Sequence, residues 1–99
     1  MLVAQGNLPE AQKAYRDSLT IRDRLAKSDP GNAGWQRDLS VSYGKIAMLK
    51  ARQGAHAEAL GTLEQGRDIA VRLARQSPEN AILQRDVGWF DRQIAAQKQ

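Results

Sequence analysis

The chain repeats itself at a fixed spacing of 48 positions. The segment LAKSDPGNAGWQRDL at residues 25–39 returns as LARQSPENAILQRDV at residues 73–87. The same offset aligns further pairs: Gln5-Gly6 with Gln53-Gly54, Glu10-Ala11 with Glu58-Ala59, and Ile21 with Ile69. Self-similarity at one period is the signature of stacked units that bury their apolar faces against one another. The repeat therefore predicts a solenoid built from one kind of unit.

The composition indicates that these units are helical. Alanine, leucine, glutamine and arginine are frequent, and all four are good helix formers. The β-branched residues are scattered and form no alternating run of the kind a strand needs. The sequence predicts an all-α fold of antiparallel helix–turn–helix repeats, with about four helices in a single domain.

Turn residues mark the helix boundaries. Proline lies next to polar residues at 28–32 and again at 76–80, where Asn32 and Asn80 are placed to cap the helices that follow. The predicted helices are 8–27, 33–53, 56–75 and 81–97.

A second kind of turn is predicted at residues 5–10 and 54–58. In the first, Gly6 suits the position after a helix end, and Asn7 suits the cap of the next helix. The second keeps the glycine as Gly54 but lacks the asparagine. We therefore expect the helix after Gly54 to fray more readily at its start.

Apolar and small residues recur at helical spacing in three of these segments. In helix 56–75 they are Ala59, Leu63, Gly66, Ala70 and Leu73. In helix 8–27 they are Ala11, Ala14, Tyr15, Leu19 and Leu25. In helix 33–53 they are Trp35, Leu39, Ser42, Tyr43, Ile46, Ala47 and Leu49.

Several of these positions match a known repeat pattern. Tyr43, Ile46 and Ala47 occupy its large, apolar and small positions in a first helix, and Ala59 and Leu63 fit its second helix. On these residues the chain resembles the tetratricopeptide repeat (TPR) family. The segment WQRDLSVSY at 35–43 resembles a bacterial subset found in long arrays. The period of 48 exceeds the family's usual length of about 34, so longer helices are expected.

The resemblance divides the chain into a partial unit 1–32, a full unit 33–80 and a partial unit 81–99. It implies a non-catalytic scaffold for protein–protein interaction. The first helix of each unit would line a concave binding face. The implied partner-binding residues are Val41, Gly44, Met48, Arg52, Trp89 and Arg92. An apolar anchor from a peptide or protein partner would fit this stripe, and the arginines would favour an acidic one. Packing of these residues against a neighbouring helix or a second copy is the alternative.

Nothing in the sequence indicates catalysis or a cofactor. His56 is the only histidine and lies in a predicted turn, which favours a solvated side chain over a general base. The chain has no cysteine, no metal-ligand cluster and no phosphate-binding glycine loop. We expect no enzyme, no cofactor and no metal.

The net charge of +4 raises nucleic-acid binding as an alternative function. Basic residues are spread over every predicted helix and interleaved with acids, which is more typical of a solvated surface. The repeated Gln-Arg-Asp is interpreted as structural, with ion pairs predicted between Arg24 and Asp38 and between Arg72 and Asp86. Nucleic acid is therefore the less favoured partner.

The ends of the chain suggest self-association. Helix 81–97 carries Trp89, Phe90 and Ile94 with no second helix after it, and capping repeats normally present polar outer faces. We expect a homodimer with Trp89 or Phe90 buried at the interface. Docking of the last helix of one chain onto the first helix of another is the alternative, and such a heterologous contact could propagate. No window is apolar enough to span a membrane, and the N-terminal segment does not resemble a signal peptide. The sequence thus predicts a cytoplasmic protein.

Overall fold

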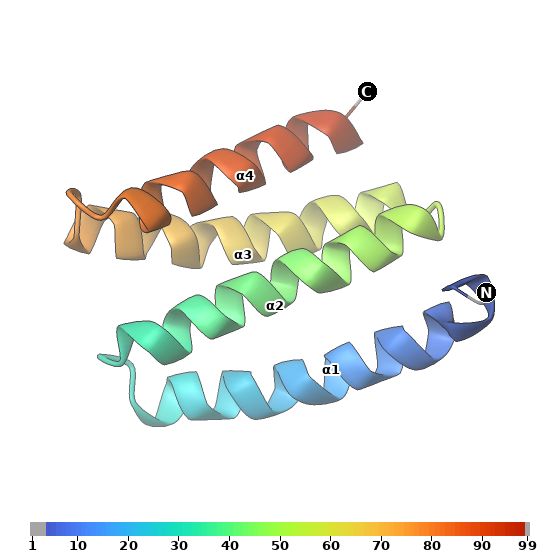
Figure 1. Cartoon of the computed structure of the whole chain (residues 1–99), viewed down its shortest axis with the longest axis horizontal. Coiled ribbons are helices and arrows are strands. Elements are labelled where there is room, and N and C mark those ends of the chain that lie inside the picture. The colour runs from blue at the N-terminus through green and yellow to red at the C-terminus, as the bar shows by residue number, and fades with distance from the viewer. Residues whose placement is uncertain (1–3, 99) are drawn as a thin grey trace.

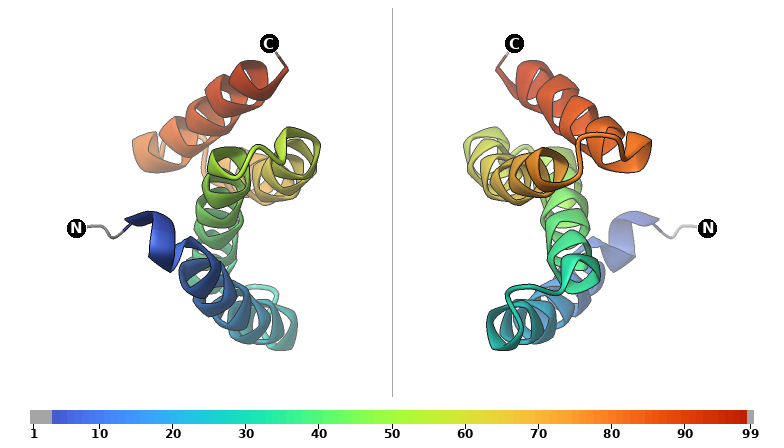
Figure 2. Two further views of the ribbon diagram at one scale, coloured as in Figure 1. Left: turned by 90° about the vertical axis from the view of Figure 1, so that its right-hand side faces the viewer. Right: turned by 90° about the vertical axis from the view of Figure 1, so that its left-hand side faces the viewer.

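The computed structural model describes residues 4–98, with side chains from residue 10 onward. It is all-α and contains four helices, α1 (Ala4–Ser28), α2 (Ala33–Arg52), α3 (His56–Gln76) and α4 (Ala81–Gln97). They pack against one another in sequence order, from α1 at one side of the molecule to α4 at the other (Figures 1 and 2). The predicted fold class is confirmed. None of the described helices is long and apolar enough to cross a membrane.

The asparagine caps lie where the turn chemistry predicted them. Asn32 Oδ1 accepts a hydrogen bond from the Trp35 backbone N–H at 3.0 Å. Asn80 Oδ1 accepts from the N–H groups of Ile82 and Leu83 at 3.0 and 3.3 Å. Each cap satisfies backbone donors that have no partner within the helix. These contacts explain why α2 and α4 begin where they do.

The short turn between α2 and α3 depends on a glycine. Gly54 has a φ of +81°, in the left-handed region that residues with a Cβ rarely adopt. Ala55, which precedes α3, offers no side-chain cap to the helix. The side-chain cap is thus absent at this helix start, and its readier fraying stays a prediction.

The predicted turn at residues 5–10 is wrong. The structure places this segment inside α1, which begins at Ala4. At Gly54 the chain leaves one helix and reverses to pack the next against it. Within residues 4–98 no helix precedes Gly6 on which such a reversal could pack, and the backbone there continues as helix. Asn7 consequently lies within α1 instead of capping it.

The glutamine of the repeated Gln-Arg-Asp motif ties together the two helices of a hairpin. Gln36 Nε2 donates to the carbonyl of Ala26 at 3.1 Å, and Gln84 Nε2 donates to the carbonyl of Ala74 at 3.3 Å. Both bonds reach back ten residues to the last turns of the previous helix. Carbonyls in that region lack helical partners, so the glutamine supplies them with a donor. The motif repeats because the same hairpin is built twice.

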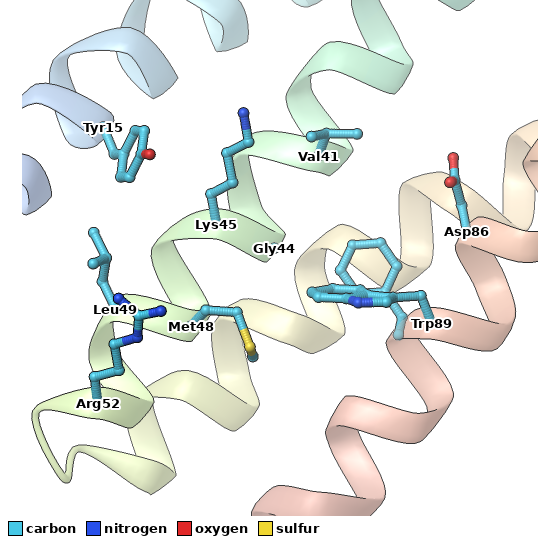
Figure 3. Close-up of a pocket in the computed structure, with 10 residues that line it drawn as sticks. Tyr15, Val41, Gly44, Lys45, Met48, Leu49, Arg52, Asp86 and Trp89 are labelled. Carbon is cyan, nitrogen blue, oxygen red and sulfur yellow. The ribbon is translucent and has the colours of Figure 1, made fainter.

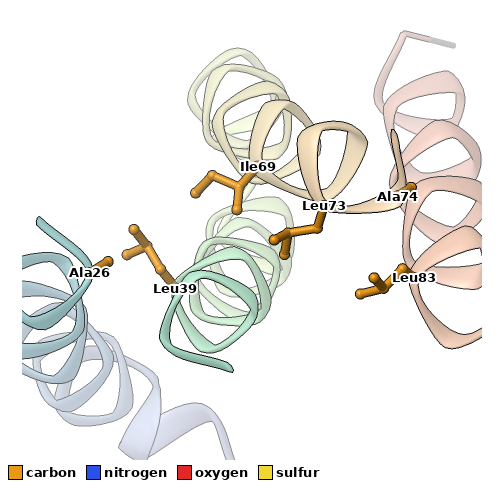
Figure 4. Packing of buried hydrophobic residues seen from close by; sticks show 6 residues of the cluster. All are labelled: Ala26, Leu39, Ile69, Leu73, Ala74 and Leu83. Carbon is orange, nitrogen blue, oxygen red and sulfur yellow. The ribbon is translucent and has the colours of Figure 1, made fainter. Parts of the chain in front are cut away.

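Two hydrophobic clusters form the core. The first draws residues from all four helices (Figure 4), and they are Ala26, Leu39, Ile69, Leu73, Ala74 and Leu83. The second comprises Ala47, Leu63, Ala70 and Phe90. The predicted apolar face of α3 is confirmed, since all five of its residues are buried. Burial of these side chains supplies the main driving force for packing.

The predicted apolar face of α1 is wrong in most positions. Ala14, Tyr15 and Leu25 are exposed, whereas Gln12 and Ala26 are the buried residues of this helix from residue 10 onward. The reason is that α1 packs mainly against one helix, α2, so the part of its stripe that α2 does not cover remains exposed.

The predicted ion pairs are also wrong. Asp86 pairs with Arg37 instead of Arg72, and the carboxylate oxygens lie 2.8 Å from Nε and 3.2 Å from Nη2. Asp86 lies on the face of α4 that is turned toward α2, which takes it away from its predicted partner on α3. The pair therefore joins the arginine of one motif copy to the aspartate of the next.

Candidate functional site

A pocket of about 390 Å³ lies between α2 and α4, with one residue contributed by α1. Figure 3 shows it, with the Trp89 indole extending from α4 toward α2. Its lining is mostly apolar and consists of Tyr15, Val41, Gly44, Lys45, Met48, Leu49, Arg52, Asp86, Trp89 and Phe90. The volume falls within the usual range of small-ligand sites and suits one or two amino-acid side chains.

Gly44 allows Trp89 to lie directly on the backbone of α2. A Cβ added at Gly44 would stand 3.0 Å from Cζ3 and 3.2 Å from Cη2 of the indole. A side chain at this position would therefore push the indole away. The glycine makes room for a large aromatic surface at the base of the pocket.

Phe90 lies beneath Trp89 and is part of the protein core. The two rings meet edge to face, with centroids 5.0 Å apart and an interplanar angle of 83°, a favoured aromatic geometry. Phe90 is only 3% exposed, and it packs closely against Gly66 of α3. The expectation that Phe90 forms an unfinished surface is wrong. It is already covered within its own chain, because two glycines let it enter the space between the helices.

The rim of the pocket carries positive charge. Lys45 and Arg52 are exposed residues of α2 at the pocket edge. The carboxylate of Asp86 also lies at the edge, but it is bound in two hydrogen bonds by Arg37. Hydrogen bonding to Asp86 raises the pKa of the Arg37 guanidinium, and this outweighs the opposing effect of burial. The free charges at the rim are thus the two cations of α2.

Five of the six residues predicted to line a concave face meet in this pocket: Val41, Gly44, Met48, Arg52 and Trp89. Arg92 does not line it. Its guanidinium lies back over Gly88, one turn earlier on α4. Among the residues predicted for self-association, Trp89 is half-buried on the pocket, and Ile94 is half-buried against the second core cluster.

Sequence reasoning missed Tyr15, Lys45, Leu49 and Asp86. Lys45 follows Val41 by four positions and precedes Met48 by three, so helical spacing alone places it on the same face. Leu49 directly follows Met48 in the sequence. Tyr15 and Asp86 belong to other helices, and no local pattern links them to α2.

The pocket combines apolar surface with charged side chains at its rim. The described residues contain no cluster of three potential metal ligands. His56 is the first residue of α3, exposed, with Nδ1 2.7 Å from Oε1 of Gln97, and it does not line the pocket. The groups that do line it favour an apolar side chain at the base and a carboxylate at the rim.

Comparisons with known proteins found no match among protein-family models, curated proteins or solved structures. The geometry of the pocket is therefore the basis for a functional proposal.

Proposed function

We propose that this chain is a non-catalytic, TPR-like interaction module that binds a peptide segment in the pocket between α2 and α4. One observation carries the proposal. Residues that the TPR resemblance implied for partner binding, among them Val41, Met48 and Trp89, converge on one apolar pocket with a cationic edge.

The pocket chemistry defines the partner. An aromatic or large aliphatic side chain of the peptide would lie on Trp89 and displace water from Met48 and Val41. A neighbouring Asp or Glu would reach Lys45 or Arg52, where charge complementarity aids encounter and register. The expected ligand is thus a segment with an apolar anchor next to an acidic residue.

Selection from a random-peptide display library tests the proposal. The wild-type chain should enrich peptides that combine a large apolar residue with Asp or Glu. Binding of the enriched peptides should be lost in a Met48→Glu, Arg52→Glu double variant, because it places two anions where the proposal needs apolar surface and positive charge. Arg75→Glu is the matched control, since Arg75 is exposed on α3 away from the pocket.

Two results would count against peptide binding at this pocket. One is that the double variant, still helical by circular dichroism, captures the same peptides as the wild type. The other is that no peptide is enriched while generic DNA binds with steep salt dependence. That pattern would support the nucleic-acid alternative.

A further inference from the structure

Three large apolar residues of α1 are exposed although their repeat equivalents on α3 form the core. The pairs related by 48 positions are Tyr15 with Leu63, Ile21 with Ile69, and Leu25 with Leu73. The exposed fractions are 37%, 59% and 38% on α1, against 0%, 7% and 5% on α3. The difference arises because α3 packs against both α2 and α4, whereas α1 packs mainly against α2. The α1 surface defined by Tyr15, Ile21 and Leu25 is thus a core face without its cover, here called the α1 face.

A matching uncovered surface lies on α4. Ala47 of α2 is fully buried, while its equivalent Ala95 is exposed. Ser40 is 1% exposed and bonds the carbonyl of Gly66 on α3, whereas its equivalent Gly88 is only half-buried. The surface of α4 that includes Gly88 and Ala95, here called the α4 face, corresponds to the part of α2 that α3 covers. The two helices that carry these faces, α1 and α4, lie at opposite ends of the row of helices (Figure 2).

Among the described side chains, each copy of the Gln-Arg-Asp motif has one charged residue that forms an ion pair and one that does not. Arg37 of the first copy binds Asp86 of the second. The other halves of the two motifs are Asp38 and Arg85, both exposed and without an ion pair within residues 10–98. If a further unit followed at the same spacing, Arg85 would meet its aspartate. A preceding unit would offer an arginine to Asp38 in the same way.

We propose that a second copy of this chain stacks head to tail on the first. The α1 face of one copy covers the α4 face of the other, as α3 covers α2 within the chain. Arg85 of the first copy then pairs with Asp38 of the next, repeating the contact between Arg37 and Asp86. This contact is heterologous and leaves both outer ends free to add further copies. It goes beyond the proposed peptide binding and does not depend on it.

Side-chain sizes at the proposed junction support this register. Within the chain, Gly44 of α2 faces the large Trp89 and Phe90 of α4. At the junction, the residue of α4 equivalent to Gly44, 48 positions later, is Arg92. The next copy would present Val41 in the place of Trp89, while Ser42, in the place of Phe90, is already buried in its own chain. The larger Arg92 thus meets the smaller Val41, so the exchange of volume leaves room for Arg92 without overpacking.

The proposed stacking differs from the homodimer expected from the sequence, which placed Trp89 or Phe90 at the interface. Phe90 is already buried within the chain, and Trp89 is half-buried on the pocket. Head-to-tail contacts also make a distinct prediction for mass. Sedimentation equilibrium from micromolar to millimolar concentration should show a mean mass that rises past the dimer, whereas a closed dimer would level off.

A charge exchange between two variants tests the register. Arg85→Asp alone would set two carboxylates against each other at the junction, and Asp38→Arg alone would set two guanidinium groups together. Each variant should associate at least about tenfold more weakly than the wild type. An equimolar mixture should regain the wild-type mass. Both kinds of junction between the two variants pair an arginine with an aspartate, whereas a junction between two copies of the same variant does not. Arg75→Asp, which alters an exposed arginine outside the proposed junction, serves as the control and should associate like the wild type.

A glutamate substitution on either face tests the apolar contact between the α1 face and the α4 face. Ile21→Glu disables the α1 face, and Ala95→Glu disables the α4 face. Both positions are exposed, so the helical content should be unchanged. Each variant alone should remain a monomer, and their mixture should stop at a dimer because one functional junction remains. A monomeric wild type at millimolar concentration, a mass that levels off at the dimer, or no recovery in the charge-exchanged mixture would each overturn the proposal.

Discussion

Gly66 and Gly44 decide how deeply the aromatic residues of α4 enter the molecule. A Cβ on Gly66 would stand 2.6 Å from Cε1 and Cζ of Phe90 and 3.1 Å from the carbonyl of Ser40. The phenyl ring and the α2 backbone would both have to move. Gly61 lies on the same helix as Gly66, but a Cβ there would meet nothing within 4 Å. Two glycines of α3 therefore have opposite roles.

We predict that Gly66→Ala destabilises the chain and that Gly61→Ala stabilises it. The first change overpacks the space filled by Phe90, at a cost of about 1–3 kcal/mol. The second removes glycine flexibility from an exposed helix position, a gain of about 0.5–1 kcal/mol. Urea unfolding of both variants measures the difference. Equal effects of the two substitutions would contradict the packing of Phe90 against Gly66.

Ionisation of Tyr43 makes the stability of the folded chain depend on pH in the alkaline range. Burial raises the pKa of its phenol, and the nearby carboxylate of Asp23 raises it further. The folded state therefore keeps the proton at pH values where the unfolded chain, with a phenol pKa of about 10, begins to lose it. This contribution to stability is complete below about pH 10 and is lost as the pH rises through the folded pKa.

We predict that Tyr43→Phe reduces the loss of stability at alkaline pH. Phenylalanine keeps the ring packing and cannot ionise. Urea unfolding of wild type and variant at about pH 8 and about pH 11 isolates the phenol, because other titrating groups are common to both. If both proteins lose the same free energy of unfolding between these pH values, ionisation of Tyr43 does not contribute.

At the scale of the helix, caps decide where α2 and α4 begin, whereas α3 begins without one. Asn80 holds two N–H groups at the start of α4, and that helix buries only Leu83 and Phe90. With so little burial to hold it, the start of α4 depends strongly on its cap. The start of α3 is supported instead by seven buried residues along the helix.

We predict that Asn80→Ala lowers the free energy of unfolding by about 1 kcal/mol. The loss should be local, because the freed donors are those of Ile82 and Leu83. Hydrogen exchange read by NMR should show faster exchange of these two amides, with little change in α2. Unchanged exchange at both amides would show that solvent replaces the cap at no cost.

At the scale of the molecule, stability should be greatest in the middle of the row of helices. Each of α2 and α3 buries seven residues, whereas α4 buries two. In α1, Gln12 and Ala26 are the buried positions among residues 10–28. Units of a solenoid gain stability from their neighbours, so helices at the ends lose part of that support. Local opening should therefore begin at α1 and α4.

We predict a graded pattern of amide exchange across the chain at low concentration. Amides of α2 and α3 should be the most protected, and those of α1 and α4 the least. Hydrogen-exchange mass spectrometry resolves the four helices. A single protection level along the whole chain would indicate one cooperative unit and contradict this view.

Much of the architecture could be predicted from local chemistry. The caps at Asn32 and Asn80, the turn at Gly54 and the apolar face of α3 depend on residues close in sequence, and the structure confirms them. The TPR resemblance also assigned Val41 and Met48 to a binding face, and both line the pocket. The turn at Gly6 failed because its pattern was read from a repeat unit whose preceding helix has no counterpart within residues 4–98.

The sequence by itself determined an all-helical repeat, because helix propensity, caps and periodicity act over a few residues and recur at 48 positions. Only the tertiary structure decided how the repeats face one another. The pairing of Arg37 with Asp86, the burial of Phe90 and the position of Tyr15 at the pocket depend on how each helix is rotated and crossed against its neighbours. Those angles follow from the volumes of side chains that meet across helices.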